Sequence, residues 1–542
     1  MVHPAETDDL DDAVDQLRAA YDATPYTSVS FPPSAPGQLA AVAHLFGLET
    51  PEVSTARVLE IGCATGGNLI PFAAAHPQAR VVGLDLSPVQ VDLGIAKARA
   101  LGLDNLGFVA GDIARMDLTA LGQFDFIIAH GVYSWVPPQV QEALLSGFRK
   151  LLAPKGVAYM SYNVYPGWKS KEVLRDAMLL ASGGSATPDD KAREARGMVD
   201  FLEDVVPADG VLARVLAEFR VNSEGFEDSY LLHDELETFN SPCYFYEMLA
   251  SARAHGLAFL AEARLEAMFP GNYGPKVEEH LLEKCGGVQV LVEQYIDFVV
   301  NRMFRESLLV HAEREPQIRY NPDRSRFRHL HIAAWVPPAD EPSRLDNSRQ
   351  EYQQADGATL FTNDPGIKAA LDVLSDRWPW TSSRHELVNA VHARLVDAGL
   401  TPSASLPDLI DNLMGVLIVQ GQARYRLDPV LPETAPEPLR LDETARRMVK
   451  LSGNESQAWT FNLWHETLML SPLDHHLLPL LDGTRDRDAL VEALLVAVRE
   501  NPIPIERDGH EVSGEAEMRD VLVDYIDALP QHLADMKLLG AD

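Results

Sequence analysis

The stretch V-L-E-I-G-C-A-T-G-G-N, residues 58–68, decides the fold of this chain. An apolar run at residues 56–61 enters a glycine-rich turn, a short helical segment follows at 68–75, and a second apolar run occupies 80–84. Apolar runs that are joined through a glycine turn and a helical segment predict a β-α-β unit. Because nucleotides bind at the turn after the first strand of such a unit, the stretch also predicts a nucleotide site.

The spacing of the glycines does not match the dinucleotide fingerprint. The glycines are Gly62, Gly66 and Gly67, and Ala64 stands where G-x-G-x-x-G has its second glycine. Glu60 lies at the strand tip, where a carboxylate would repel a diphosphate at close range and would suit an ammonium group instead. The turn therefore indicates a ligand other than a dinucleotide.

Two further acidic residues follow strand ends. Asp85 ends the second apolar run, where a carboxylate can accept hydrogen bonds from both hydroxyl groups of a ribose. Residues 106–110 read as a third strand and lead into Gly111-Asp112-Ile113, where the acid can accept the exocyclic amine of adenine and the isoleucine can pack on the ring. We expect a nucleoside that carries a positively charged amino acid and no phosphate.

The remaining pattern completes an α/β sheet. Residues 124–129 and 156–161 read as the fourth and fifth strands, separated by an amphipathic helix at 139–152 and a turn at 153–156. Two later apolar runs, one starting at Gly256 and the other at residues 304–311, are the expected sixth and seventh strands. Buried strands that alternate with helices predict a doubly wound parallel sheet, which binds ligands at the carboxyl ends of its strands.

These motifs resemble the class I S-adenosylmethionine-dependent methyltransferases: E-I-G-C-A-T-G, G-L-D-L-S, G-D-I, F-D-F-I-I-A-H and L-L-A-P-K-G occur in that order. The resemblance implies a Rossmann-like seven-stranded class I methyltransferase sheet with S-adenosylmethionine as cofactor. It implies that the methionine moiety contacts the glycine turn, that Asp85 binds the ribose, and that Asp112, Ile113 and Leu86 surround the adenine. The implied residues of the turn are Glu60, Gly62, Cys63, Gly66 and Asn68.

The stretches G-G-N-L-I-P, H-G-V-Y-S-W-V-P and S-Y-N-V-Y-P-G-W are similar to the family with a methyltransferase regulatory domain, which includes bacterial lysine methyltransferases of outer-membrane proteins. Residues 21–40 resemble the N-terminal lid of that family, which adds Tyr21 and Tyr26 to the expected cofactor site. Residues 230–245 resemble its regulatory segment. The resemblance implies a protein or peptide as methyl acceptor.

Amphipathic aromatic residues follow the fourth and fifth strands, where the acceptor would be presented to the cofactor. An aromatic, partly apolar channel lowers the pKa of an amine and attracts its methylated forms through cation–π contacts. His130 is either a proton acceptor or a ring in contact with the methionine end of the cofactor, and we favour contact. Cys63 is interpreted as a space-filling residue of the turn. The candidate channel residues are His130, Tyr133, Trp135, Tyr162, Asn163, Tyr165 and Trp168.

We expect five regions: an N-terminal helix and lid (1–45), the methyltransferase core (46–168), a helical and regulatory insertion (169–315), a winged-helix-like α+β module (316–430) and a second such module (440–542). In the first module, helices are expected at 366–374, 384 onward and 408–413, and V-L-I-V-Q-G-Q-A-R-Y-R-L is expected to form a hairpin. A capping box at Ser383 and a cap at Thr484 mark two helix starts. The modules are expected to grip the acceptor protein.

Composition narrows the classes of function. The 542 residues include 46 basic and 80 acidic side chains, a net charge of −34, which argues against nucleic acid as a partner. Three scattered cysteines fit a reducing compartment, and without a long apolar run or a leader-like N-terminus we expect a cytoplasmic protein with no membrane insertion. His475 and His476 are adjacent and diverge on a helix, so we expect no metal site.

Three functions remain open from the sequence. The first is transfer of methyl groups to protein lysines, the second is methylation of a small molecule or peptide natural product, and the third is a non-catalytic scaffold with a methyltransferase fold. The intact acidic motifs disfavour the scaffold. The sequence leaves the oligomeric state open.

Overall fold

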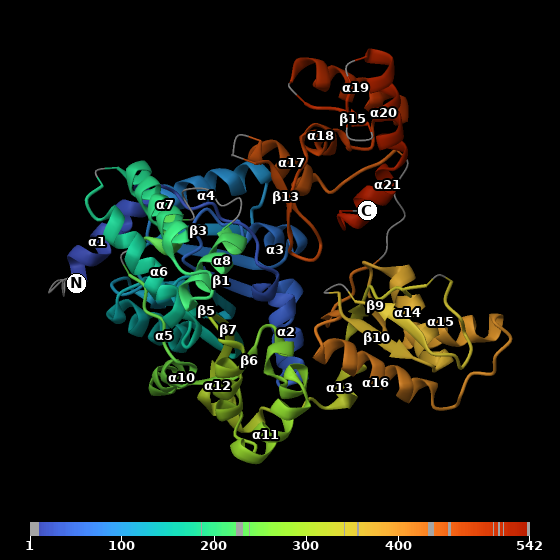
Figure 1. Cartoon of the computed structure of the whole chain (residues 1–542), viewed down its shortest axis with the longest axis horizontal. Coiled ribbons are helices and arrows are strands. Elements are labelled where there is room, and N and C mark those ends of the chain that lie inside the picture. The colour runs from blue at the N-terminus through green and yellow to red at the C-terminus, as the bar shows by residue number, and fades with distance from the viewer. Residues whose placement is uncertain are drawn as a thin grey trace.

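The computed structural model places a mixed sheet of seven strands at the centre of the larger lobe (Figure 1). It describes residues 10–185, 187–223, 231–237, 239–340, 342–354, 357–431, 438–453, 457–501, 503–507, 510–512 and 514–538. The strand order is β3-β2-β1-β4-β5-β7-β6, and β7 alone runs antiparallel to its neighbours. This is the predicted class I methyltransferase sheet. The strands are β1 (Arg57–Ile61), β2 (Arg80–Asp85), β3 (Leu106–Ala110), β4 (Phe124–Ala129), β5 (Leu152–Asn163), β6 (Leu257–Glu262) and β7 (Phe304–His311).

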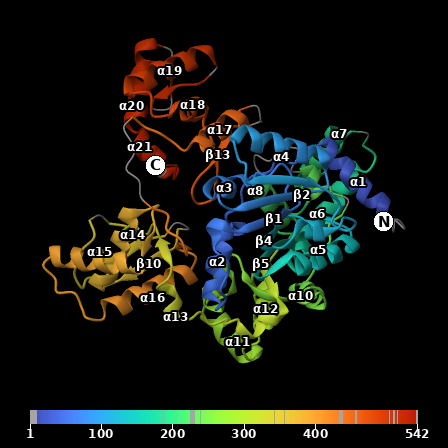
Figure 2. The ribbon, with the colours of Figure 1, turned by 180° about the vertical axis from the view of Figure 1, so that it is seen from behind.

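Helices cover both faces of the sheet, which explains why its central strands are buried and largely apolar (Figure 2). Every residue of β4 is buried. The strands expected at Gly256 and at 304–311 are confirmed as β6 and β7. The turn expected at 153–156 falls inside the bounds of β5, at the register shift that separates the pair Phe124–Leu152 from the pair Phe126–Val157. The helices of this lobe up to the insertion are α1 (Leu10–Ala23), α2 (Pro36–Leu45), α3 (Ile70–Ala75), α4 (Pro88–Leu101) and α5 (Pro138–Leu151).

The insertion between β5 and β6 has its own small apolar core. Helices α6 (Gly167–Ser182), α7 (Pro188–Val205) and α8 (Val211–Ser223) pack around Leu174, Met178 and Val199 together with a π-helical turn, Leu231–Glu235. The polar helical region expected after residue 168 is therefore present. Helix α10 (Phe245–Ala254) precedes β6 and packs against it, and helices α11 (Pro275–Cys285) and α12 (Gln289–Val300) connect β6 to β7.

Two C-terminal modules form separate bodies beside the sheet (Figure 1). The first module combines α13 (Arg324–Phe327), the hairpin β9 (Gln350–Gln353) and β10 (Thr359–Thr362), helices α14 (Pro365–Arg377), α15 (Arg384–Asp397) and α16 (Leu406–Val419), and a sheet of β8 (His331–Ala333), β11 (Ser382–Ser383) and β12 (Arg424–Arg426). The capping box at Ser383 is confirmed. The hairpin expected to start at V-L-I-V-Q is wrong. Ile410, Met414 and Leu417 form one buried helical stripe, so the V-L-I-V segment belongs to α16. Strand β12 pairs with β8 instead.

The second module starts at α17 and has its own apolar core. It contains α17 (Glu443–Ser452), the hairpin β13 (Trp459–Phe461) and β14 (Thr467–Met469), α18 (Pro472–Leu477), α19 (Arg487–Glu500), β15 (Glu506–Arg507), β16 (His510–Glu511), α20 (Glu515–Asp527) and α21 (Leu529–Asp535). Thr484 is not the cap of α19, because its hydroxyl bonds Asp482 and Asp486 caps the helix. Within the described residues, no helix is both long and apolar enough to cross a membrane.

Candidate functional site

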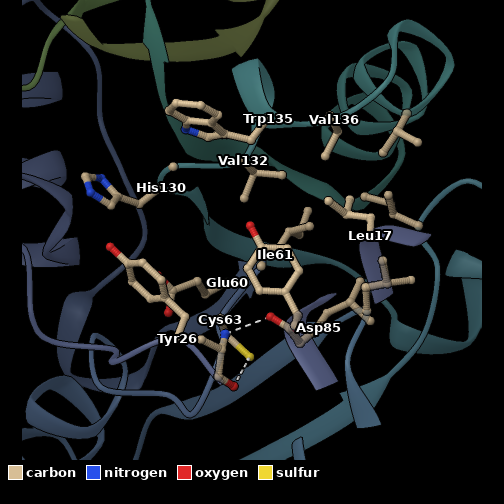
Figure 3. A pocket seen from close by; sticks show the side chains of 18 of the residues that line it. Leu17, Tyr26, Glu60, Ile61, Cys63, Asp85, His130, Val132, Trp135 and Val136 are labelled. Atoms are coloured by element: carbon tan, nitrogen blue, oxygen red, sulfur yellow. Dashed lines mark hydrogen bonds between the residues drawn. The ribbon is translucent and has the colours of Figure 1, made fainter. Parts of the chain in front are cut away.

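A cavity of about 520 Å³ opens where β1, β2 and β4 end, at the edge of the sheet predicted to bind the ligand (Figure 3). The segment around α1 and the turn before α2 form its opposite wall, through residues such as Leu17, Tyr26 and Phe31. Most of the predicted site residues line this cavity. They are Tyr21, Tyr26, Glu60, Gly62, Cys63, Asn68, Asp85, Leu86, Asp112, Ile113, His130, Trp135, Asn163 and Trp168.

The glycine turn brings Asp85 into the cavity and fixes its carboxylate. Gly62 has a φ of +74°, and a Cβ there would lie 2.4 Å from the side chain of Val132, so the turn requires glycine. Asp85 accepts hydrogen bonds from the backbone N–H of Ala64 at 2.7 Å and of Ser87 at 2.9 Å. The carboxylate is therefore held in one orientation, with lone pairs left for two hydroxyl groups of a ribose.

Glu60 has the properties expected of a partner for a cationic ligand. Its Oε1 accepts a hydrogen bond from Asn68 Nδ2 at 2.8 Å, whereas its Oε2 is buried and has no hydrogen-bond partner among the residues that the structure describes. Burial is the main reason that the pKa of Glu60 rises to about 8, and the nearby Asp85 raises it further. A buried carboxyl with a free oxygen fits the ammonium of the methionine moiety.

The far end of the cavity fits the adenine. Asp112 Oδ1 accepts the backbone N–H of Ala114 at 2.8 Å, and Ile113 and Leu86 supply apolar side chains to the wall.

Cys63 is buried within the turn, and burial raises the pKa of its thiol. This environment agrees with the interpretation of Cys63 as a space-filling residue, because the thiol form is not nucleophilic.

His130 lies at the other end, against the lid. Its ring packs against Phe31 at a tilt of 30° with the two ring centres 3.6 Å apart, and its Nδ1 lies 2.9 Å from the hydroxyl of Tyr159. Burial lowers the pKa of His130 to about 3, so the ring is neutral at physiological pH and a poor proton acceptor. This favours a contact role over a catalytic one.

Four predicted residues do not line the cavity. Gly66 shapes the turn from behind, where a Cβ would lie 2.5 Å from the ring of Phe108. Tyr162 is buried in the sheet with its hydroxyl 2.9 Å from Ser307 Oγ, and Tyr133 packs edge-on against Tyr162. The third aromatic residue of the set, Tyr165, lies outside and donates to Glu172 Oε1 at 2.6 Å. Of these residues, Tyr162 lies within β5, where alternate side chains point to opposite faces, so the loop pattern alone could not place it.

The end of the cavity at Trp135 and Trp168, where the acceptor is expected from the sequence, contains a lysine that the sequence did not single out. Trp135 and Trp168 meet edge to face at 6.1 Å, and Lys171 Nζ lies 4.6 Å from the centre of the Trp168 ring. The same Nζ is 2.6 Å from Oε1 of Glu235, a buried side chain whose Oε2 has no hydrogen-bond partner within the described part of the chain. The only sequence signal was the i, i+3 spacing of Trp168 and Lys171 on one helix.

Sequence reasoning also missed Phe31 and a distant residue, His465, which contacts Asn68 from the second C-terminal module. Phe31 follows the expected lid tyrosines and could have been found from the lid resemblance. No local pattern marks His465, since it lies almost 400 positions from its partner.

Sequence profiles of three known domains match the chain: a methyltransferase domain over residues 58–156, a predicted methyltransferase regulatory domain over 227–311, and the PKMT C-terminal winged helix domain over 444–538. The uncharacterized protein RP789 of Rickettsia prowazekii is 33% identical over 511 residues, which cover 92% of this chain and 90% of that protein. The solved structure of PKMT2 from Rickettsia typhi in complex with AdoHcy matches with a TM-score of 0.84 and 26% identity, covering 95% of this chain and 100% of that one.

Proposed function

Because this chain belongs to the class I S-adenosylmethionine-dependent methyltransferases that carry a methyltransferase regulatory domain, we propose that it methylates lysine side chains of a protein acceptor. The methyltransferase activity and the cofactor are properties of the family. The proposal concerns the acceptor, and the PKMT winged helix domain of the second module supports it.

The observation that carries the proposal is the placement of Lys171. An ammonium group at the acceptor end of the cavity lies over the face of the Trp168 indole and beside the Glu235 carboxylate. An indole face and a carboxylate are the partners that an alkylammonium group prefers. The wall therefore already accommodates the side-chain type that the proposal assigns to the acceptor.

The surface beside this end supports a polypeptide acceptor. Tyr244 stacks on Tyr246 at 5.6 Å and on Phe298 at 5.9 Å, and Tyr165 packs against Tyr244 at 5.4 Å. Tyr246 and Phe298 are 50% and 57% exposed. The backbone of Tyr165 bonds Cys243, which ties these aromatic residues to the loop that carries the cavity wall. An exposed aromatic surface next to the cavity offers contacts to residues that flank a target lysine.

The sulfonium of the cofactor supplies an electrophilic methyl group when it is bound. The residues of the chain orient the reactants: Glu60 holds the ammonium end, Asp85 the ribose, and Trp135 and Trp168 flank the acceptor amine. The amine must lose a proton before it attacks. Since His130 is a poor base, the amine releases its proton to solvent, and the apolar part of the wall, with Val132 and Val136, lowers the pKa of the bound lysine and favours the neutral form that attacks the methyl group.

The experiment is transfer of radiolabelled methyl groups into a lysate of the host cell, separated into protein and small-molecule fractions. We expect label in protein bands, recovered as methylated lysine after hydrolysis. The Asp85→Ala variant, which loses the ribose contact, is the matched control for label that does not depend on the enzyme. Label confined to small molecules, or label that base treatment releases as an ester, contradicts the lysine proposal.

A further inference from the structure

The second C-terminal module reaches the cofactor site through the tip of its β13–β14 hairpin. Figure 1 shows this hairpin beside α3 and α4 of the methyltransferase lobe. His465, in the turn of the hairpin, is 5% exposed, and its Nε2 lies 3.0 Å from Asn68 Oδ1. Asn68 belongs to the stretch that follows β1 and lines the cavity. A residue of the second module is thus in direct contact with the first glycine motif.

Asn68 connects this histidine to the two groups that enclose the methionine end. Its Nδ2 donates to Glu60 Oε1 at 2.8 Å, and its Oδ1 accepts the backbone N–H of Phe31 at 2.8 Å. Because an amide oxygen accepts only, the ring nitrogen of His465 must be the donor. The amide of Asn68 is therefore fixed with its N–H side toward Glu60 and its oxygen toward the lid and the hairpin.

A second contact ties the same hairpin to the lid. Thr467 Oγ1 accepts the backbone N–H of Ser30 at 3.0 Å and lies 2.7 Å from Ser30 Oγ. The lid in turn rests on the glycine turn: Ser28 Oγ accepts the backbone N–H of Gly67 at 2.9 Å, and a Cβ on Gly67 would lie 2.0 Å from the Ser28 carbonyl oxygen. Lid, turn and hairpin form one hydrogen-bonded layer behind the cofactor cavity.

The charge state of His465 suits a permanent contact. Burial is the main reason that its pKa falls to about 3, and the nearby Arg426 lowers it further. The ring therefore stays neutral and keeps a single N–H for Asn68. The neighbouring Glu466 anchors the hairpin, since it pairs with Arg424 of the first module and with Lys537 at 2.7 Å near the end of the chain.

We propose that His465 is a positioning residue for the cofactor site, which acts through Asn68 on Glu60 and on the lid, so that docking of the second module and binding of the cofactor favour each other. The sequence suggested that the C-terminal modules grip the acceptor. These contacts give the second module a role at the opposite, cofactor end. The inference concerns the methyl donor and does not depend on which acceptor is methylated. Linkage makes the coupling reciprocal.

The test compares two substitutions in the full-length protein. His465→Leu removes the donor with little change in volume, and His465→Gln restores a donor at similar reach. We expect His465→Leu to raise the Kd for AdoHcy and the KM for S-adenosylmethionine about five- to tenfold, the usual effect of one buried hydrogen bond, with kcat at saturating cofactor within about twofold. We expect His465→Gln to recover most of the affinity.

His532→Leu is the matched control, because it removes a histidine hydrogen bond within the same module, to Asp474 at 3.0 Å, that involves neither Asn68 nor the lid. Its KM for the cofactor should not change. Hydrogen exchange adds an independent readout: AdoHcy should slow amide exchange in residues 459–469, and His465→Leu should speed it in residues 26–34.

An unchanged cofactor affinity in His465→Leu with the module still docked overturns the proposal, as does a rise in the KM of the acceptor alone. If His465→Leu does not fold, Thr467→Val replaces it, since that change removes the contact with Ser30 and carries the same expected outcomes. Absence of AdoHcy-dependent protection at 459–469 in the unmodified protein is an equally direct refutation.

Discussion

Glu60→Gln separates the charge of Glu60 from its shape. The substitution keeps an oxygen for the hydrogen bond from Asn68 Nδ2 and replaces the buried, unpartnered Oε2 with a neutral amide. A hydrogen bond between a carboxylate and an ammonium contributes about 1.5–3 kcal/mol, so we expect the Kd for AdoHcy to rise about 10- to 150-fold. Titration calorimetry at pH 7.5 gives this value directly.

The pH dependence of binding is the sharper part of this prediction. Because the pKa of Glu60 is raised to about 8, the carboxyl is mostly protonated in the free protein below that pH. An ammonium ligand binds the ionised form, so wild-type affinity should increase as the pH rises, by roughly 20-fold from pH 6 to 7.5, with a proton released on binding. Glu60→Gln should show neither effect, and comparison of the two proteins cancels the titration of the ligand.

Glu266→Gln serves as the control, since Glu266 is also a partly buried carboxyl with a raised pKa but lies outside the cavity. It should keep the wild-type affinity and its pH profile. If Glu60→Gln binds AdoHcy as tightly as wild type, or with the same pH dependence, then Glu60 does not hold the ammonium and the orientation assigned to the cofactor is wrong.

Four further predictions follow from other observations. Asp85→Ala should weaken AdoHcy binding by about 1–3 kcal/mol in calorimetry. The wild-type protein should bind NAD and ATP negligibly, because buried carboxylates disfavour phosphates. Micromolar affinity for either nucleotide would contradict the assigned site. Trp135→Ala or Trp168→Ala should lower turnover about 100-fold in a methyl-transfer assay, while AdoHcy affinity stays within about 1 kcal/mol. If turnover and AdoHcy affinity fall equally, these rings contact the cofactor and not the acceptor. Arg305→Met should lower the free energy of unfolding by about 3–5 kcal/mol in urea denaturation, because it leaves three buried carboxylates around an apolar side chain; a loss below about 1 kcal/mol would show that the cluster relaxes.

The methyltransferase core could be predicted from the sequence because its information is local. Glu60 and Asp85 lie in the last two residues of their strands and Asp112 lies two residues after β3, and parallel strands bring their carboxyl ends to one edge whatever the rest of the chain does. The order of the motifs therefore placed the cofactor residues around one cavity. The same reasoning was weaker for the acceptor end, where Tyr133, Tyr162 and Tyr165 do not reach the wall.

The errors arose where two local patterns competed. The apolar run after Leu413 is compatible with a strand and with the end of a helix. It is helical because its buried side chains lie on the same face of α16 as Ile410 and Met414. At α19 both Thr484 and Asp486 are good caps, and the hydroxyl of Thr484 was instead taken by Asp482. Such choices depend on neighbours that a short window of sequence does not include.

The sequence by itself determined the nucleotide class, since glycine spacing and strand-end acids are short-range features that fix backbone geometry and charge in place. Only the tertiary structure decided which partners complete the site. Lys171 meets Glu235 across the insertion, and His465 meets Asn68 from another module. The physical reason is that hydrogen bonds and ion pairs act over about 3 Å in space, whereas these partners are far apart along the chain, so no period or motif records their meeting.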